Sequence, residues 1–70
     1  MKRFTPEQMK LNMVAYRIRR GLTQTDVAEA LNVHPKTVGR WENDPGKVSL
    51  EVLNSLAILY NCQVRDFFVD

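Results

Sequence analysis

Apolar residues recur three or four positions apart along most of the chain, and residues that begin or end helices separate the runs. The first run opens at Thr5 and Pro6, which suit the N-cap and the first helical position, with Gln8 placed for a capping box. Gly21 follows the run, where a helix C-terminus favours glycine. The apolar stripe between these ends comprises Met9, Met13 and Tyr16. The pattern predicts a helix that starts at Pro6 and ends just before Gly21.

Two shorter helices are predicted next, separated by about three residues. Thr23 and Asp26 mark the start of one, and Asn32, which tolerates a left-handed conformation, marks its end. Pro35 fits the first turn of the other, which runs to about residue 42, with His34 in the capping position. The apolar positions of the two helices are Val27, Ala28, Leu31, Val38 and Trp41.

The last third of the chain predicts two further helices after a turn at residues 43–46. Ser49 caps a helix that ends at Asn61, and residues 64–69 form a final short helix. The predicted fold is therefore all-α, a compact bundle of five short helices. We expect its core to contain Met13, Tyr16, Leu22, Val27, Ala28, Leu31, Val38, Trp41, Leu50, Leu53, Leu56, Ala57 and Phe67.

The first helix also carries a second apolar stripe, Leu11, Val14 and Ile18, on a different face. Monomeric proteins seldom expose large apolar patches, so we expect the last helix to cover this stripe with Phe67 or Phe68. The other interpretation is that the stripe is a surface for a protein partner.

Composition narrows the class without naming a function. Seventy residues, 44% of them hydrophobic and 26% charged, describe a single globular domain over residues 1–70. There is no apolar run long enough to span a membrane and no signal peptide, which favours a cytoplasmic location. One cysteine and one histidine make neither an internal disulfide nor a metal cluster, and we predict no cofactor. The net charge of +2 permits nucleic-acid binding but does not argue for it.

Residues 23–42 form two short helices with a tight turn, the arrangement of a helix-turn-helix. Its flanks make the pattern specific. The segment Gly21-Leu22-Thr23-Gln24, followed by Val27-Ala28, resembles the "GLTQ..LA" signature of the Cro/lambda-repressor-like (Xre) family. The segment from Val38 to Asn43 resembles the family's "IsrWEnG", and the segment from Ser49 to Leu53 resembles "SLETL". Residues 59–62 stand where "ALGV" usually lies.

The resemblance implies duplex DNA binding, with the second helix of the unit in the major groove. The positions that face base edges in the family are Pro35, Lys36, Thr37 and Arg40. The candidates for phosphate contacts are Thr23, Gln24, His34, Asn43 and Lys47. Each has a plainer interpretation, because Lys36 and Arg40 also suit a solvated face and Thr23 and Gln24 also suit a cap alone. Gly39 either allows close approach of the backbone to DNA or is merely tolerated.

The resemblance also implies a structural ion pair between Arg17 and Glu42. Three positions depart from the family pattern: Asp44 replaces a glycine, Val48 a proline, and Gln63 a Ser/Thr cap. Pro45 and Gly46 shape the loop after Asn43 differently from the family pattern, which weakens the expectation of phosphate contacts from Asn43 and Lys47.

The function that the sequence favours is that of a small bacterial or phage-type transcriptional regulator, a repressor acting as a homodimer on a pseudo-palindromic operator. Phe68, Val69 and the loop near Val48 are the candidates for dimer contacts. The alternative is an antitoxin-like or adaptor module that binds protein through the same fold. We expect no enzyme, because neither Cys62 nor His34 has a nucleophile-base partner nearby in the sequence.

Overall fold

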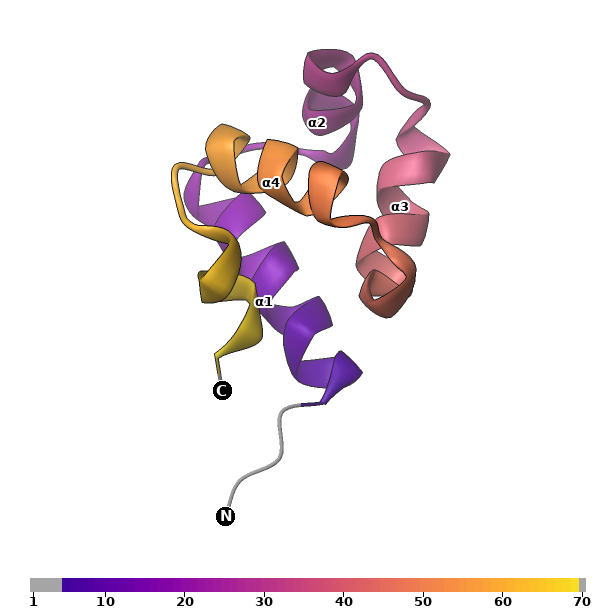
Figure 1. Ribbon diagram of the computed structural model, residues 1–70. Helices are drawn as coiled ribbons and strands as arrows, with labels where there is room; N and C mark the ends of the chain where they lie inside the picture. Colours follow the sequence, from indigo (N-terminus) through magenta and orange to yellow (C-terminus); the bar gives the residue numbers. More distant parts are fainter. Residues whose placement is uncertain (1–4, 70) are drawn as a thin grey trace.

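The computed structural model describes residues 5–69, which fold into four α-helices and two 3₁₀ helices without a β-strand (Figure 1). The elements are α1 (Pro6–Arg19), α2 (Gln24–Leu31), α3 (Pro35–Asn43), η1 (Pro45–Lys47), α4 (Leu50–Leu59) and η2 (Val64–Phe68). The all-α prediction is confirmed; the predicted fifth helix is the 3₁₀ turn η2 rather than an α-helix. Within the described part of the chain, no helix is long and apolar enough to cross a membrane.

Side-chain caps begin all four α-helices, as their sequences indicate. Thr5 and Ser49 accept hydrogen bonds from the backbone N–H three residues ahead. Thr23 forms a complete capping box, and Nδ1 of His34 accepts from the N–H of Lys36 at 3.0 Å. The capping box expected at the start of α1 is wrong: the Thr5 hydroxyl accepts from the Gln8 N–H, but the Gln8 side chain bonds to Asn12 and makes no return bond to the Thr5 backbone. These bonds satisfy N–H groups that a helix start otherwise leaves unpaired.

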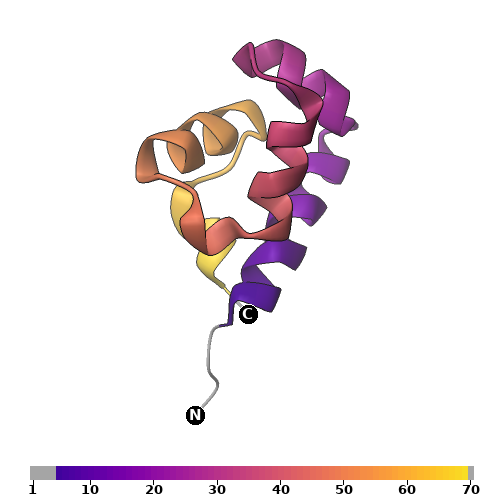
Figure 2. The same ribbon diagram turned by 90° about the vertical axis from the view of Figure 1, so that its right-hand side faces the viewer.

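Left-handed glycine or asparagine residues follow three of the α-helices, α1, α2 and α4. Gly21, Asn32 and Asn61 have φ angles of 70°, 56° and 57°. This conformation costs an ordinary L-residue about 1–2 kcal/mol, whereas glycine and asparagine adopt it readily. The chain therefore reverses sharply after α1, α2 and α4, which lets short helices pack on one another (Figures 1 and 2).

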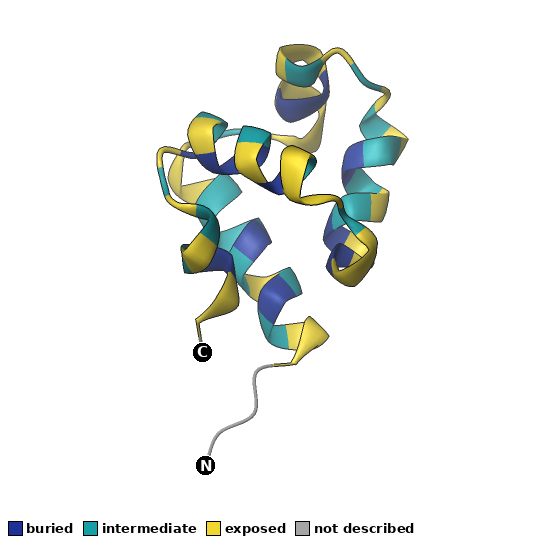
Figure 3. Cartoon of the chain, viewed as in Figure 1, coloured by how far each residue is buried: buried dark blue, intermediate teal, exposed yellow. Residues whose placement is uncertain are grey.

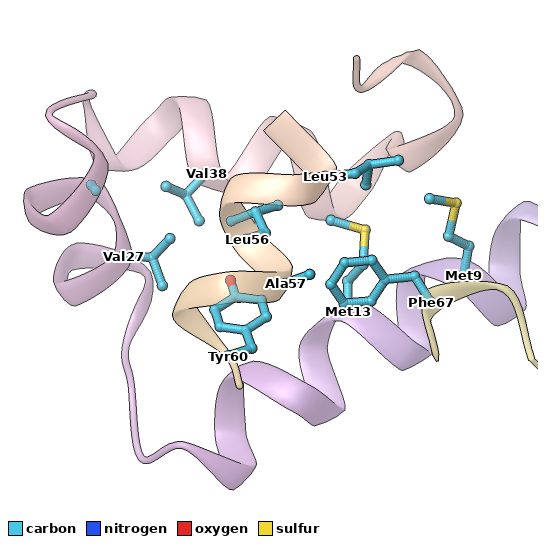
Figure 4. Packing of buried hydrophobic residues seen from close by; sticks show 10 residues of the cluster. Met9, Met13, Val27, Val38, Leu53, Leu56, Ala57, Tyr60 and Phe67 are labelled. Atoms are coloured by element: carbon cyan, nitrogen blue, oxygen red, sulfur yellow. The ribbon is translucent and has the colours of Figure 1, made fainter. Parts of the chain in front are cut away.

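The core lies where α1, α4 and η2 meet and extends to the contact between α2 and α3 (Figure 4). Phe67 is fully buried, and its ring makes edge-to-face contacts with Tyr16 and Tyr60 at 6.1 and 6.4 Å between centroids. The buried hydrophobic residues are Met9, Met13, Val27, Ala28, Val38, Leu53, Leu56, Ala57, Tyr60 and Phe67. Met9 and Tyr60 are additions to the predicted core, while Tyr16, Leu22, Leu31 and Trp41 pack at its edge.

Leu50 is the one predicted core residue that is wrong, because it is 70% exposed. It is the first residue of α4, one turn before Leu53 enters the core. Side chains on a helix lean toward its N-terminus, so Leu50 projects past the end of the packed region.

The expectation that the last helix covers the second stripe of α1 is also wrong. Leu11 and Ile18 are 56% and 61% exposed, and Val14 is half-buried. The segment η2 packs on another side of α1, where the Asn12 amide donates to the carbonyls of Phe67 and Val69. The outer face of α1 therefore stays open to solvent (Figure 3).

Candidate nucleic-acid interface

The pair α2 and α3 forms a helix-turn-helix, joined by the three residues 32–34. The left-handed Asn32 reverses the chain, and the N–H of Val33 donates to the carbonyl of Ala28 at 2.9 Å. Val27 and Val38, one from each helix, are buried in the same core. The turn and this apolar contact fix the angle at which α3 leaves α2.

A polar network of Arg17, Gln24 and Glu42 connects α3 to α1 and α2. Arg17 Nε lies 2.7 Å from Glu42 Oε2, and its Nη1 donates to the carbonyl of Leu22 at 2.8 Å. The Gln24 amide donates to Glu42 Oε1 at 2.9 Å. The side chains of Arg17 and Glu42 are only 14% and 7% exposed. Side chains from α1 and α2 thus hold Glu42, which lies near the end of α3.

Tyr60 lies close enough to this network for its ionisation to be affected. Burial, assisted by the negative charge of Glu42 and opposed by Arg17, raises the pKa of Tyr60 far above its ordinary value. The Tyr60 hydroxyl therefore stays protonated next to the ion pair.

The residues of α3 divide into a buried and an exposed side. Val38 and Glu42 are buried against α1 and α2, whereas Lys36 and Arg40 are exposed. Pro35 and Thr37 are half-buried at the margins. Positions 36 and 40 are four residues apart and so lie above one another on one side of the helix. All four base-contact candidates thus lie on the first two turns of α3, with two cations toward solvent.

The two arginines at the C-terminal end of α1, Arg19 and Arg20, make contacts within the protein. The Arg19 guanidinium lies 4.8 Å from the centre of the Tyr16 ring, and Arg20 Nε donates to the carbonyl of Leu59. Within residues 5–69, Lys36 and Arg40 form no ion pair. Lys36 and Arg40 therefore place two positive charges on the exposed side of α3, without an ion-pair partner in the described part of the chain.

The phosphate candidates at the start of α2 are already engaged. The Thr23 hydroxyl accepts from the N–H of Asp26 at 3.0 Å, and its own N–H donates to the Asp26 carboxylate at 2.8 Å. The bond from the Thr23 backbone N–H to the Asp26 carboxylate, assisted by the Thr23 side chain, holds the pKa of Asp26 below its usual value, so a negative charge stays at this helix end. The Gln24 amide is held by Glu42. In the free protein Thr23 thus caps α2, and Gln24 links α2 to Glu42 of α3.

The remaining phosphate candidates lie at the two ends of α3. Because Nδ1 of His34 accepts the cap hydrogen bond, the neutral ring carries its proton on Nε2, a donor that the cap does not use. Asn43 is exposed at the C-terminus, and Lys47 Nζ lies 3.6 Å from Asp44 Oδ2.

Gly39 has room for a side chain. A Cβ at this position meets only the Gln24 amide, at 3.8 Å or more, which is ordinary van der Waals contact. The packing of the helices therefore does not require glycine here.

Sequence reasoning missed two contacts that shape this surface, the Gln24–Glu42 hydrogen bond and the Asp44–Lys47 ion pair. The first joins residues 18 positions apart, so only the packing of α2 on α3 reveals it. The second had a local signal, because an acid and a lysine three residues apart within a turn are close enough to pair.

Comparison with known proteins gives one clear result. Searches of curated proteins and of solved structures returned no match. The helix-turn-helix family model matches residues 14–67, which include all of the unit 23–42 and most of the chain. The arrangement of α2 and α3 agrees with this match. The chain belongs to the Cro/C1-type, Xre-like helix-turn-helix family of DNA-binding regulatory domains.

Proposed function

We propose that this single domain binds duplex DNA in a sequence-specific manner, with α3 in the major groove. The observation that carries the proposal is the division of α3 into a buried side locked by Glu42 and an exposed side carrying Lys36 and Arg40. A major groove about 12 Å wide admits a helix, and its base edges offer acceptors to such cations. A rigid helix with free cations on its outer side suits this task.

Each base-contact candidate has a role that follows from its chemistry. The planar guanidinium of Arg40 makes a paired contact with O6 and N7 of guanine, and Lys36 makes a single-point contact with guanine or phosphate. The Thr37 hydroxyl contacts either base edge or a phosphate oxygen. Pro35 supplies an apolar surface at the start of the helix.

The phosphate candidates position the domain without reading sequence. His34 donates from Nε2, and Asn43 donates from its amide at the other end of α3. Gln24 contributes its second amide hydrogen, since one is used by Glu42. Thr23 contributes least, because Asp26 occupies its cap and keeps a negative charge beside it.

We propose further that the protein acts as a homodimer that represses transcription in the cytoplasm. One recognition helix reads only a few base pairs, and a two-fold dimer doubles the site, with half-sites about 34–36 Å apart. Phe68 and Val69 are about half exposed at the C-terminal end, and Val48 is half-buried near η1. These three residues are the proposed dimer contacts.

The exposed face of α1 favours a second candidate function, that of an antitoxin-like or adaptor module. Leu11 and Ile18 are more than half exposed on this face. Hydrophobic residues so placed suit a protein partner better than DNA. Enzymatic activity is not proposed, because the helix-turn-helix family is typically non-enzymatic.

Selection of bound duplexes from a random pool, followed by sequencing, tests the proposal. We expect enrichment of one motif with two-fold symmetry. Enrichment of an asymmetric half-site would refute the dimer, and no enrichment by folded protein would favour the protein-binding module. Pull-down with a Leu11→Ser, Ile18→Ser variant as control then tests the face of α1.

A further inference from the structure

A hollow of about 440 Å³ lies beside the recognition helix, between the last turns of α3 and η1. Arg40 and Lys47 contribute cations to its walls, Asn43 contributes an amide, and Trp41 and Val48 contribute apolar surface. Since Arg40 also belongs to the exposed side of α3, the hollow adjoins the proposed DNA surface.

One acidic residue, Asp44, shares this hollow with the cations. Its Oδ2 lies 3.6 Å from Lys47 Nζ, and the two side chains are 56% and 85% exposed. An ion pair so open to water is weak and readily exchanged for another partner. Lys47 therefore has its charge balanced in the free protein by a contact that a DNA phosphate can replace.

The structure gives the Asp44 carboxylate no part in shaping the loop. The backbone N–H of Asp44 donates to the carbonyl of Arg40, and its carbonyl accepts from the N–H of Lys47. Pro45 is buried, and η1 contacts α1, which anchors the turn. A negative charge at the C-terminus of α3 also opposes the helix dipole. The negative charge of Asp44 is thus unfavourable for α3, and among residues 5–69 Lys47 is the cation that pairs with it.

We propose that Asp44 limits the affinity of the domain for DNA by competing with a backbone phosphate for Lys47. The hollow between α3 and η1 is then a phosphate site, and the residue at position 44 sets its strength. This proposal rests on the proposed function, since the phosphate belongs to the duplex that α3 reads. It makes position 44 a determinant of affinity that contacts no base.

The test compares binding of the enriched duplex by wild type, Asp44→Asn, Lys47→Gln and the double variant, using fluorescence anisotropy from about 50 to 300 mM salt. Asp44→Asn keeps the shape of the side chain and removes its charge. Glu29→Gln, an exposed change of equal charge on α2 outside the hollow, is the matched control.

We expect Asp44→Asn to bind up to about fivefold more tightly, the full worth of an exposed ion pair. Its plot of log K against log salt should steepen by about 0.9, the value for one added phosphate contact. Both gains should vanish in the Lys47→Gln background, and Glu29→Gln should reproduce neither.

Unchanged or weaker binding by Asp44→Asn would overturn the proposal, with circular dichroism establishing that the variant is folded. A gain that persists without Lys47 would also overturn it, because Asp44 would then act by direct repulsion of DNA. A wild-type chain that binds no duplex at all would refute the proposed function itself, and this proposal with it.

Discussion

Replacement of Arg17 by methionine tests whether the Arg17–Glu42 ion pair holds the recognition helix α3 in place. The change removes the guanidinium but keeps a long apolar stem, so the Glu42 carboxylate loses a partner at 2.7 Å. It also removes the hydrogen bond to the carbonyl of Leu22. Glu42 keeps only the Gln24 amide, while its side chain remains 7% exposed.

The expected loss in the free energy of unfolding depends on whether the Arg17–Glu42 pair behaves as a buried or as an exposed ion pair. Breaking a buried pair from one side costs about 3–5 kcal/mol, and an exposed pair is worth under about 1 kcal/mol. Exposures of 14% and 7% place Arg17 and Glu42 near the buried limit, and the Gln24 hydrogen bond offsets part of the cost. We therefore expect a loss of about 3 kcal/mol, a large share of the roughly 4–10 kcal/mol typical of a domain this size.

Urea unfolding followed by circular dichroism at neutral pH measures this loss. Arg65→Met, an exposed change of equal charge, is the control and should stay within about 0.5 kcal/mol of wild type. The double variant Arg17→Met, Glu42→Met should be more stable than Arg17→Met alone, because it leaves no unpaired carboxylate. A loss below about 1 kcal/mol for Arg17→Met, or a double variant less stable than the single one, would refute the reasoning.

Three further predictions test packing, backbone and ionisation by the same unfolding measurement. Leu50 is 70% exposed, so Leu50→Ala should change the free energy of unfolding by less than about 0.5 kcal/mol. Leu56 is 1% exposed, so Leu56→Ala should lower it by about 2–5 kcal/mol. Equal losses for the two variants would contradict the burial pattern. Gly39→Ala should stabilise by up to about 1 kcal/mol, because its Cβ has room, whereas Gly21→Ala should destabilise, because φ is 70° there; the same sign for both would count against this account. Because the pKa of Tyr60 is raised in the folded protein, the Tyr60 hydroxyl ionises at lower pH in the unfolded chain than in the folded one. The wild type should therefore lose stability above about pH 10, and Tyr60→Phe should lack that part of the loss. Parallel pH profiles of the two proteins would show that folding does not raise the pKa of Tyr60.

The parts of this fold that the sequence predicted are those decided by local chemistry. The caps at Thr23, His34 and Ser49 are hydrogen bonds that span at most three residues. The left-handed turns at Asn32 and Asn61 depend on the conformational preference of a single asparagine each. Such interactions are the same wherever the helices pack, so the order of elements followed from them. The family resemblance rested on this same local pattern.

The errors about which apolar residues are buried occur where tertiary packing decides. Leu50 fits the apolar stripe of α4 by spacing, but spacing does not say where the covering elements end. Leu11 and Ile18 likewise have core-like spacing on α1, yet η2 packs on the side marked by Asn12. The role of Gln24 was hidden for the same reason, since its partner Glu42 lies on another helix. Periodicity identifies a face, and only the packed structure identifies its neighbour.

The central claim is that the exposed side of α3 reads base edges, and repeating the duplex selection with Arg40→Ala tests it most directly. Arg20→Ala is the matched control, because Arg20 bonds to the carbonyl of Leu59 and is not part of the proposed reading surface. We predict that Arg40→Ala relaxes one base position in each half-site, at a cost of about 1–3 kcal/mol, while Arg20→Ala selects the wild-type motif. Unchanged preference at every position with Arg40→Ala would contradict the claim that α3 is the reading helix.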